Sequence, residues 1–276
     1  MEQLAGKVVV VTGGASGIGL AVARHFGAEG ARLVLADIEQ GALEAAAASF
    51  DGSVEVVTSV TDVSSGADVE ALRDRALDAY GAVHVVCNNA GVGGGGPLQD
   101  VSIADWEWVL GVNLWGVIHG VRTFLPLLLE QGEGHIVNTA SVAGLYAAPY
   151  MGPYNVSKYG VVSLSETLAV ELSMTASPVG VSVLCPSWVK TNIATSRRNR
   201  PSDGGPAPSP EEEEGIAQII EHFLTTGMEV DEVATAVVDA VRTHTFWILT
   251  HDETPEQVRR RTKAILDGDA PPLLTH

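Results

Sequence analysis

Short apolar runs rich in β-branched residues alternate with longer helical patterns along the chain. The runs are KVVVVT (7–12), ARLVLAD (31–37), VEVVTSV (54–60), VHVVCN (83–88), GHIVNTA (134–140), VGVSVLCP (179–186) and FWILT (246–250). Most are apolar throughout, as expected of strands that are covered on both faces. Their alternation with helical stretches predicts an α/β fold, a single doubly wound domain of about seven parallel strands with helices on both faces.

One segment interrupts this alternation. Residues 196–215, SRRNRPSDGGPAPSPEEEEG, are rich in proline, glycine and charge and cannot form a core. Too little chain follows to make a second domain, so we expect one domain over residues 1–276 with a mobile excursion at 192–228. The excursion could be a lid over a substrate, and it could equally be an insertion without a catalytic role. The stretch TPEQVRRRTKAILDG predicts a short terminal helix.

Charge and cysteine content restrict the partners. The 276 residues include 34 acidic and 16 basic ones, a net charge of −18. Such a surface repels phosphate backbones and anionic lipids, so we expect neither nucleic acid nor membrane as partner. No apolar run approaches membrane-spanning length, and the N-terminus has no signal-like pattern. Cys87 and Cys185 lie in apolar runs and are expected to be reduced core thiols of a cytoplasmic protein.

A glycine-rich turn, TGGASGIG (12–19), follows the first predicted strand and opens the first predicted helix. Glycines at 13, 17 and 19 let the backbone turn tightly and approach a pyrophosphate. The helix N-terminus then presents free N–H groups to the anion. A purely structural turn is the alternative, but this position between strand and helix favours a dinucleotide site.

Asp37 ends the second predicted strand, 18 residues after Gly19. A carboxylate there can accept hydrogen bonds from both ribose hydroxyls of an adenosine and would repel a 2′-phosphate. No arginine or lysine lies within the turn or just after Asp37. The sequence therefore favours NAD over NADP as cofactor.

Tyr154 and Lys158 stand four positions apart in a predicted helix, about one turn, so they share a face. Such a pair is also common on helix surfaces, and spacing alone leaves both interpretations open.

With the turn, the acid and this pair, the chain resembles the short-chain dehydrogenase/reductase family, in its single-domain NAD-dependent branch, over roughly residues 5–250. The resemblance implies a Rossmann-type fold and a homodimer or homotetramer, with residues around 104–131 and 153–175 at the interface. The catalytic positions it implies are Asn113, Ser141, Tyr154 and Lys158. The cofactor-binding positions it implies are Gly13, Ser16, Gly17, Ile18, Gly19, Asp37, Asp62, Val63, Asn89, Tyr154, Lys158, Pro186, Val189 and Thr191. No metal is implied.

The residues outside the turn each have a structural alternative. Asn113 could simply kink a helix, Ser141 could cap a strand end, and Asp62 could cap a helix. The chain also departs from the family pattern, because Ser187 stands where the family usually has glycine. This serine would be unfavourable if the turn beside the nicotinamide required a positive φ.

The resemblance implies hydride transfer between NAD(H) and a secondary alcohol or ketone, with Tyr154 as general acid/base. Lys158 and the positive nicotinamide ring would both lower the pKa of the phenol. Lys158 would also hold the nicotinamide ribose. Ser141 would bind the substrate oxygen, and Asn113 would hold a relay water.

The expected substrate walls are Gly93–Pro97, Val142–Met151 and the mobile excursion after Thr191. Their apolar members, with Trp188 and Ile193, favour a hydrophobic substrate. A catalytically silent NAD-binding sensor or scaffold is the alternative, and a sugar-nucleotide epimerase or dehydratase is a weaker one.

Overall fold

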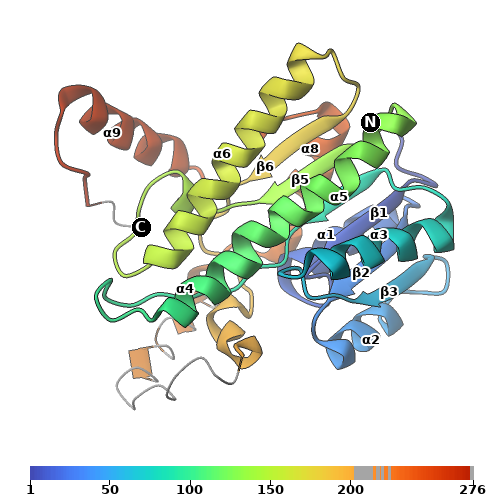
Figure 1. Ribbon diagram of the computed structural model, residues 1–276, viewed down its shortest axis with the longest axis horizontal. Helices are drawn as coiled ribbons and strands as arrows, with labels where there is room; N and C mark the ends of the chain where they lie inside the picture. Colours follow the sequence, from blue (N-terminus) through green and yellow to red (C-terminus); the bar gives the residue numbers. More distant parts are fainter. Residues whose placement is uncertain (202–213, 216–217, 219–220, 223–224, 274–276) are drawn as a thin grey trace.

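The computed structural model describes residues 1–201, 214–215, 218, 221–222 and 225–273. Its centre is one sheet of seven strands in the order β3-β2-β1-β4-β5-β6-β7 (Figure 1). Every neighbouring pair runs parallel. The strands are β1 (Val8–Thr12), β2 (Arg32–Asp37), β3 (Val56–Val60), β4 (Val85–Asn88), β5 (His135–Thr139), β6 (Gly180–Leu184) and β7 (Trp247–Ile248). The predicted fold class is confirmed.

Helices cover both faces of the sheet. One face carries α1 (Gly17–Ala28), α2 (Gln40–Ala48) and α8 (Val230–Thr243). The other face carries α3 (Gly66–Tyr80), α5 (Gly116–Gln131) and α6 (Gly152–Met174). The α5 helix continues α4 (Ile103–Leu110) through the π-helical turn η1 (Gly111–Trp115). Two 3-10 helices, η2 (Val142–Gly144) and η3 (Ile193–Asn199), follow β5 and β6.

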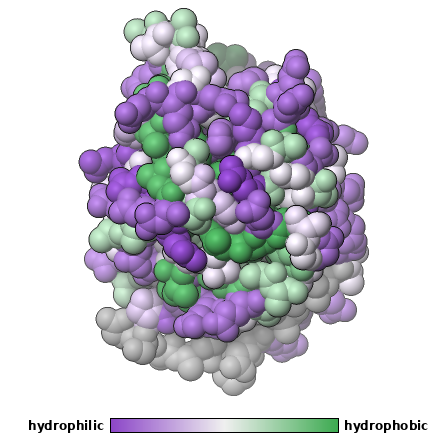
Figure 2. All heavy atoms as spheres, turned by 90° about the vertical axis from the view of Figure 1, so that its right-hand side faces the viewer, coloured by the Kyte–Doolittle hydropathy of each residue, from purple (hydrophilic) through white to green (hydrophobic). Residues whose placement is uncertain are grey.

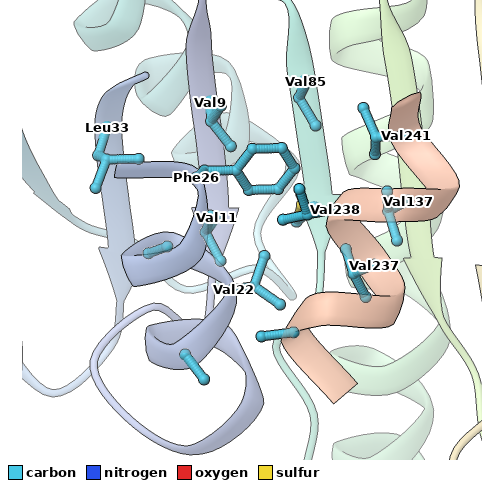
Figure 3. Close-up of a cluster of buried hydrophobic side chains, with 14 of the residues drawn as sticks. Val9, Val11, Val22, Phe26, Leu33, Val85, Val137, Val237, Val238 and Val241 are labelled. Atoms are coloured by element: carbon cyan, nitrogen blue, oxygen red, sulfur yellow. The ribbon is translucent and has the colours of Figure 1, made fainter. Parts of the chain in front are cut away.

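The first strand shows why its run is apolar throughout. Val9 and Val11 belong to the core under α1 and α8, which Figure 3 shows with Phe26 among them. Val8 and Val10 belong to the core on the other face, under α3, α5 and α6. Because alternate residues of a strand face opposite sides, two buried faces require a run without polar interruptions.

The predicted strands were correct in number and place but too long at their ends. The run at 246–250 pairs only over Trp247–Ile248, and the run at 54–60 only over Val56–Val60. Cys87 and Cys185 are buried free thiols, and burial raises the pKa of each to about 12. The predicted terminal helix is α9 (Thr254–Asp267), which stands away from the sheet in Figure 1.

One helical segment differs from the expectation that no apolar run approaches membrane-spanning length. The continuous helix Ile103–Gln131 is long and apolar enough, by length and composition alone, to cross a membrane. In this fold it is a core helix, because Val117, Phe124 and Leu128 of α5 pack into the buried cluster against the sheet. A core helix passes the same test, so the segment is weak evidence for a membrane span.

The expected excursion at 192–228 lies partly outside the described residues. Its described beginning, η3, is anchored in three places, at Gly93, at Glu39 and at Asp105. Its end is fixed where Met228 pairs with Val189 in an isolated parallel bridge.

Candidate active site

The predicted site residues lie along one edge of the sheet, at the carboxyl ends of the strands. Thr12 ends β1, Asp37 ends β2, and Asn89, Ser141 and Pro186 follow β4, β5 and β6 closely. The neighbours of β1 are β2 on one side and β4 on the other, so the chain reverses its winding there. Such a point leaves a crevice at the carboxyl edge, which is where open α/β sheets bind ligands.

The turn after β1 needs its glycines. Gly13 has φ +64°, and a Cβ on it would lie 2.9 Å from the Cα of Ala90. A Cβ on Gly19 would lie 2.2 Å from the carbonyl oxygen of Gly13. Ser16 is the N-cap of α1 but makes no side-chain capping bond, and Ile18 next to Gly17 packs on the core. The helix N-terminus is therefore open to an anion.

Two residues tie this turn to the end of β4. The Thr12 hydroxyl accepts hydrogen bonds from the N–H groups of Asn89 (2.9 Å) and Ala90 (3.1 Å). The Asn89 side-chain amide donates to the carbonyl oxygen of Thr12, at 3.0 Å. Asn89 was predicted from the sequence, whereas Thr12 was missed. The signal for Thr12 was its position as the last residue of the strand before the glycines.

The Asp37 carboxylate is fixed beside the turn. It accepts hydrogen bonds from the N–H of Ala15 (3.2 Å) and from the N–H of Glu39 (3.1 Å). Asp62 accepts from the N–H and hydroxyl of Ser64, at 2.9 and 2.7 Å, which is a local turn contact.

Val63 is buried, and its side chain lies against Gly116 at the start of α5. The Val63 side chain therefore lies in the core, and its predicted part in cofactor binding stays a prediction.

An arginine distant in sequence reaches the adenosine end of the crevice. Arg198 of η3 forms an ion pair of 2.6 Å with Glu39, two residues after Asp37. The Asn199 amide donates to the same carboxylate, at 2.8 Å. Arg198 and Asn199 hold the pKa of Glu39 below its usual range. The sequence shows no basic residue just after Asp37, and it gives no sign of Arg198 because 159 positions separate Arg198 from Glu39.

Tyr154 and Lys158 share a buried face of α6. Both side chains are almost fully buried, and the Lys158 ammonium lies 5.6 Å from the centre of the Tyr154 ring. Lys158 donates to the carbonyl oxygen of Thr139 at the end of β5, at 2.9 Å. Tyr154 is hydrogen-bonded to Ser141. A pair on a solvated helix surface is therefore excluded.

Burial shifts the pKa values of Tyr154 and Lys158 in the protein alone. Burial raises the pKa of Tyr154, and its hydrogen bond with Ser141 offsets only part of that rise. Burial lowers the pKa of Lys158 to about 8. In the protein alone, desolvation therefore outweighs the other effects on the phenol. The predicted lowering of its pKa, which also depends on the positive nicotinamide ring, stays a prediction.

Ser141 and Asn113 have structural contacts as well. The Ser141 hydroxyl donates to the Pro186 carbonyl oxygen (3.2 Å) and caps η2 by accepting from the N–H of Ala143 (3.1 Å). Asn113 is fully buried in the π-helical turn. Its amide oxygen accepts a hydrogen bond from the N–H of Val92 (2.8 Å), and its amide nitrogen donates one to the carbonyl oxygen of Val92 (2.9 Å). The kink and cap expected of these residues are present, and they place both side chains beside Lys158 and Tyr154.

The turn after β6 runs back toward the glycine turn. A Cβ on Gly17 would lie 3.2 Å from the Thr191 side chain, so Thr191 stands beside the start of α1. Val189 is buried. Among the described non-glycine residues, a positive φ occurs at Tyr150, Ala176 and His244. Ser187 is not one of them, so replacing the family glycine introduces no backbone strain here.

The expected substrate walls meet at one point. The N–H of Gly96 donates to the carbonyl oxygen of Tyr150, at 2.7 Å, and Gly96 pairs with Met151. Val142 and Tyr146 are buried in a small cluster with Leu145, so these two side chains support the wall from behind. Met151, Trp188 and Ile193 stay partly exposed.

Two further features concern metals and the outer surface. Within the described ranges, no group of three or more histidine, cysteine, aspartate or glutamate side chains lies close enough to hold a metal ion.

Figure 2 shows the face at the β3 edge, where hydrophilic residues predominate and hydrophobic ones gather in smaller patches. That surface agrees with the net charge of −18.

Comparison with known proteins identifies the family. A model of the short chain dehydrogenase family matches residues 7–202. The chain therefore belongs to the short chain dehydrogenase family. The predicted family and enzyme class, a dehydrogenase/reductase, are confirmed.

Three relatives cover nearly all of the chain. A short chain dehydrogenase/reductase from Burkholderia phymatum, solved in complex with NAD, is 44% identical with a TM-score of 0.93 and covers 100% of both chains. The C alpha-dehydrogenase of Sphingobium sp. strain SYK-6 is 34% identical over 98% of this chain and 89% of its own length. The 1-deoxy-11-beta-hydroxypentalenate dehydrogenase of Streptomyces arenae is 33% identical over 92% of this chain and 85% of its own.

Proposed function

We propose that the protein is an NAD-dependent oxidoreductase that transfers a hydride between NAD(H) and a secondary alcohol or ketone. The observation that carries the proposal is the buried Tyr154–Lys158 pair, hydrogen-bonded to Ser141 at the carboxyl edge of the sheet. The Lys158 ammonium lies close to Gly91, after β4, where a Cβ would be 3.7 Å from its Nζ. The experiment is NAD⁺ reduction by secondary alcohols, with NADH binding measured separately. Binding without turnover across a broad panel would favour the silent sensor.

The residues present fit NAD. The turn leaves no room for side chains at Gly13 and Gly19, and Ser16 leaves the N-terminus of α1 uncapped, as a pyrophosphate requires. Asp37 is fixed at the end of β2, where ribose hydroxyls would meet it. The proposal assigns the nicotinamide half to Lys158, Pro186, Val189 and Thr191. The relative solved with NAD supports the same choice.

The proposed chemistry needs one proton acceptor and one oxygen-binding group. Bound NAD supplies the hydride acceptor at its nicotinamide. In alcohol oxidation, Tyr154 takes the hydroxyl proton while the C–H bond breaks, and Ser141 hydrogen-bonds the oxygen as it becomes a carbonyl. In reduction Tyr154 returns the proton. Lys158 stands one turn away and holds the ribose. Asn113 keeps Val92 and the adjoining loop in place, and its role toward a relay water stays a prediction.

The acids at the end of β2 support NAD rather than NADP. Asp37 would repel a 2′-phosphate, and Arg198 is already neutralised by Glu39. Asp37→Ala should therefore weaken NAD binding about tenfold and raise the relative use of NADP. Steady-state kinetics with both cofactors is the measurement. An unchanged ratio of kcat/KM for the two cofactors would show that another group reads the ribose.

The substrate is proposed to be hydrophobic. Met151, Trp188 and Ile193 are apolar and partly exposed on the expected walls. The named relatives include a C alpha-dehydrogenase and a dehydrogenase of a pentalenate. We therefore place alcohols with aromatic or alicyclic bodies first in the substrate panel, and faster turnover of short polar alcohols would contradict this choice.

The described beginning of the excursion supports a closing role for residues 193–200. The Ser196 hydroxyl accepts from the N–H of Gly93, at 2.8 Å. Arg198 binds Glu39 beside the expected ribose site, and Arg200 forms a 2.9 Å ion pair with Asp105 of α4. This segment therefore joins the adenosine side of the crevice to the substrate side. We propose that it covers the bound cofactor.

An assembly of several copies and a cytoplasmic location are also proposed. Trp115, Val156, Val170 and Met174 are exposed apolar side chains on η1 and α6. They lie in the two regions expected at the interface of a homodimer or homotetramer. The buried free thiols Cys87 and Cys185 suit a reducing compartment.

A further inference from the structure

His251, three residues after β7, holds the turn that follows β6. The N–H of Ser187 donates to Nδ1 of His251 at 3.3 Å, and Nε2 of His251 contacts the carbonyl oxygen of Trp188 at 3.1 Å. The Thr250 hydroxyl also contacts Nδ1, at 2.8 Å. One imidazole therefore binds the backbone N–H and C=O of two consecutive residues in this turn.

These partners determine the protonation state of the ring. A backbone N–H can only donate, so Nδ1 of His251 must accept from Ser187. A carbonyl oxygen can only accept, so Nε2 must carry a proton and donate to Trp188. With the proton on Nε2, the Thr250 hydroxyl is a second donor to Nδ1.

The rest of the turn is held by other contacts. At its start, the Pro186 carbonyl oxygen accepts from the Ser141 hydroxyl and from the N–H of Val142. At its end, the N–H of Lys190 donates to the carbonyl oxygen of Met228 (3.0 Å), and the N–H of Met228 donates to the carbonyl oxygen of Trp188 (2.9 Å), which is thus shared with His251. Between these points, His251 binds the peptide units of Ser187 and Trp188. It fixes the part of the turn where this chain departs from the family glycine.

We propose that His251 is a positioning residue for the nicotinamide half of the cofactor. It acts through Ser187 and Trp188, which set the path of the backbone to Val189 and Thr191. The inference rests on the proposed function, because it presumes that the nicotinamide lies against this turn. The adenosine half is held by the glycine turn and Asp37, which His251 does not contact.

Comparing two ligands tests this inference. In His251→Phe a ring of similar size remains, but both hydrogen bonds to the turn are lost. NADH binding, followed by fluorescence titration, should weaken about tenfold, because the turn proposed to meet the nicotinamide loses both hydrogen bonds to the ring. The affinity for ADP-ribose, which lacks the nicotinamide, should stay within about twofold.

Two further variants distinguish the proposed positioning role from a folding defect. Thr250→Val leaves both bonds from the ring to the turn and should bind NADH nearly as the unsubstituted protein does. His251→Asn keeps an acceptor near Ser187 and should fall between the unsubstituted protein and His251→Phe, which supports the inference even if the phenylalanine variant fails to fold.

The opposing outcomes are distinct. Equal losses for NADH and ADP-ribose in the His251 variants would overturn the inference, since that pattern marks a general structural defect. Unchanged NADH affinity in these variants would also overturn it. If the unsubstituted protein itself binds no NADH, the proposed function fails instead.

Discussion

Lys158 is a buried ammonium that donates a hydrogen bond to the Thr139 carbonyl oxygen, its one hydrogen-bond partner among the residues that the structure describes. Burial without a carboxylate partner disfavours the charged form, which is why its pKa falls to about 8. A lysine in this position costs stability, and a catalytic role is a reason to retain it. The same dry environment raises the pKa of Tyr154, so in the protein alone the phenol holds its proton near neutral pH. To accept a proton from an alcohol, Tyr154 would need the lowering of its pKa that a positive nicotinamide ring would supply.

Lys158→Met should change the pH dependence of stability. The unfolded chain holds the lysine proton up to about pH 10.5, whereas the folded protein releases it near pH 8. Between these values the unfolded state binds more protons, so the free energy of unfolding of the unsubstituted protein rises with pH. Below pH 8 the full penalty applies, roughly 3 kcal/mol for a difference of this size.

Urea unfolding at about pH 7 and about pH 10.5 measures this effect. The advantage of Lys158→Met over the unsubstituted protein should be largest at the lower pH and shrink at the higher one. The lost hydrogen bond to Thr139 lowers this advantage by about 1 kcal/mol at both pH values. A difference between the two proteins that does not change with pH would contradict the assignment of a buried, readily deprotonated lysine.

At the scale of elements, the strands and the glycine turn were predictable because their signals are local. An apolar run reports burial on both faces, and glycines between a strand and a helix report a close backbone approach. The strand ends were not predictable, because residues such as Val54 and Leu249 continue the apolar run after pairing has stopped. The π-helical turn at Asn113 leaves no mark in the periodicity.

The contacts missed at the site all join distant parts of the chain. Arg198 reaches Glu39 across 159 positions, and His251 reaches Ser187 across 64. A single sequence gives no signal for such pairs. The rise in the pKa of Tyr154 that burial causes in the protein alone was not anticipated for a related reason, since the extent of its burial depends on packing that only the folded chain shows.

Glu39→Ala should release the segment 193–200 from the adenosine side of the crevice. If this segment covers bound NADH, the dissociation rate of NADH should rise about threefold, as expected for one partly exposed ion pair. Stopped-flow fluorescence measures the rate. Glu44→Ala, on the same helix α2, removes a carboxylate whose contact is with Gln40 and serves as the control. Equal dissociation rates for Glu39→Ala and Glu44→Ala would contradict a covering role.

For the whole molecule, the exposed apolar side chains of α6 predict self-association. Val170 is 59% exposed and Met174 is 81% exposed. Light scattering should give a mass of two or four chains of 28.8 kDa. Val170→Glu should shift the mass toward one chain, whereas Ile265→Glu, at an exposed apolar position on α9, should not. A monomeric unsubstituted protein would remove the proposed interface.

In this single α/β domain, all the proposed catalytic groups lie in one crevice at the carboxyl edge of the sheet. The most direct test of the central claim is NAD⁺ reduction with hydrophobic secondary alcohols by the unsubstituted protein, Tyr154→Phe and Tyr159→Phe. Tyr159 lies on the same helix, but its ring contacts Arg261 of α9. Turnover should fall at least about a thousandfold in Tyr154→Phe alone, with NADH affinity within a few-fold of the unsubstituted protein. Near-normal turnover in Tyr154→Phe would remove this tyrosine from the mechanism.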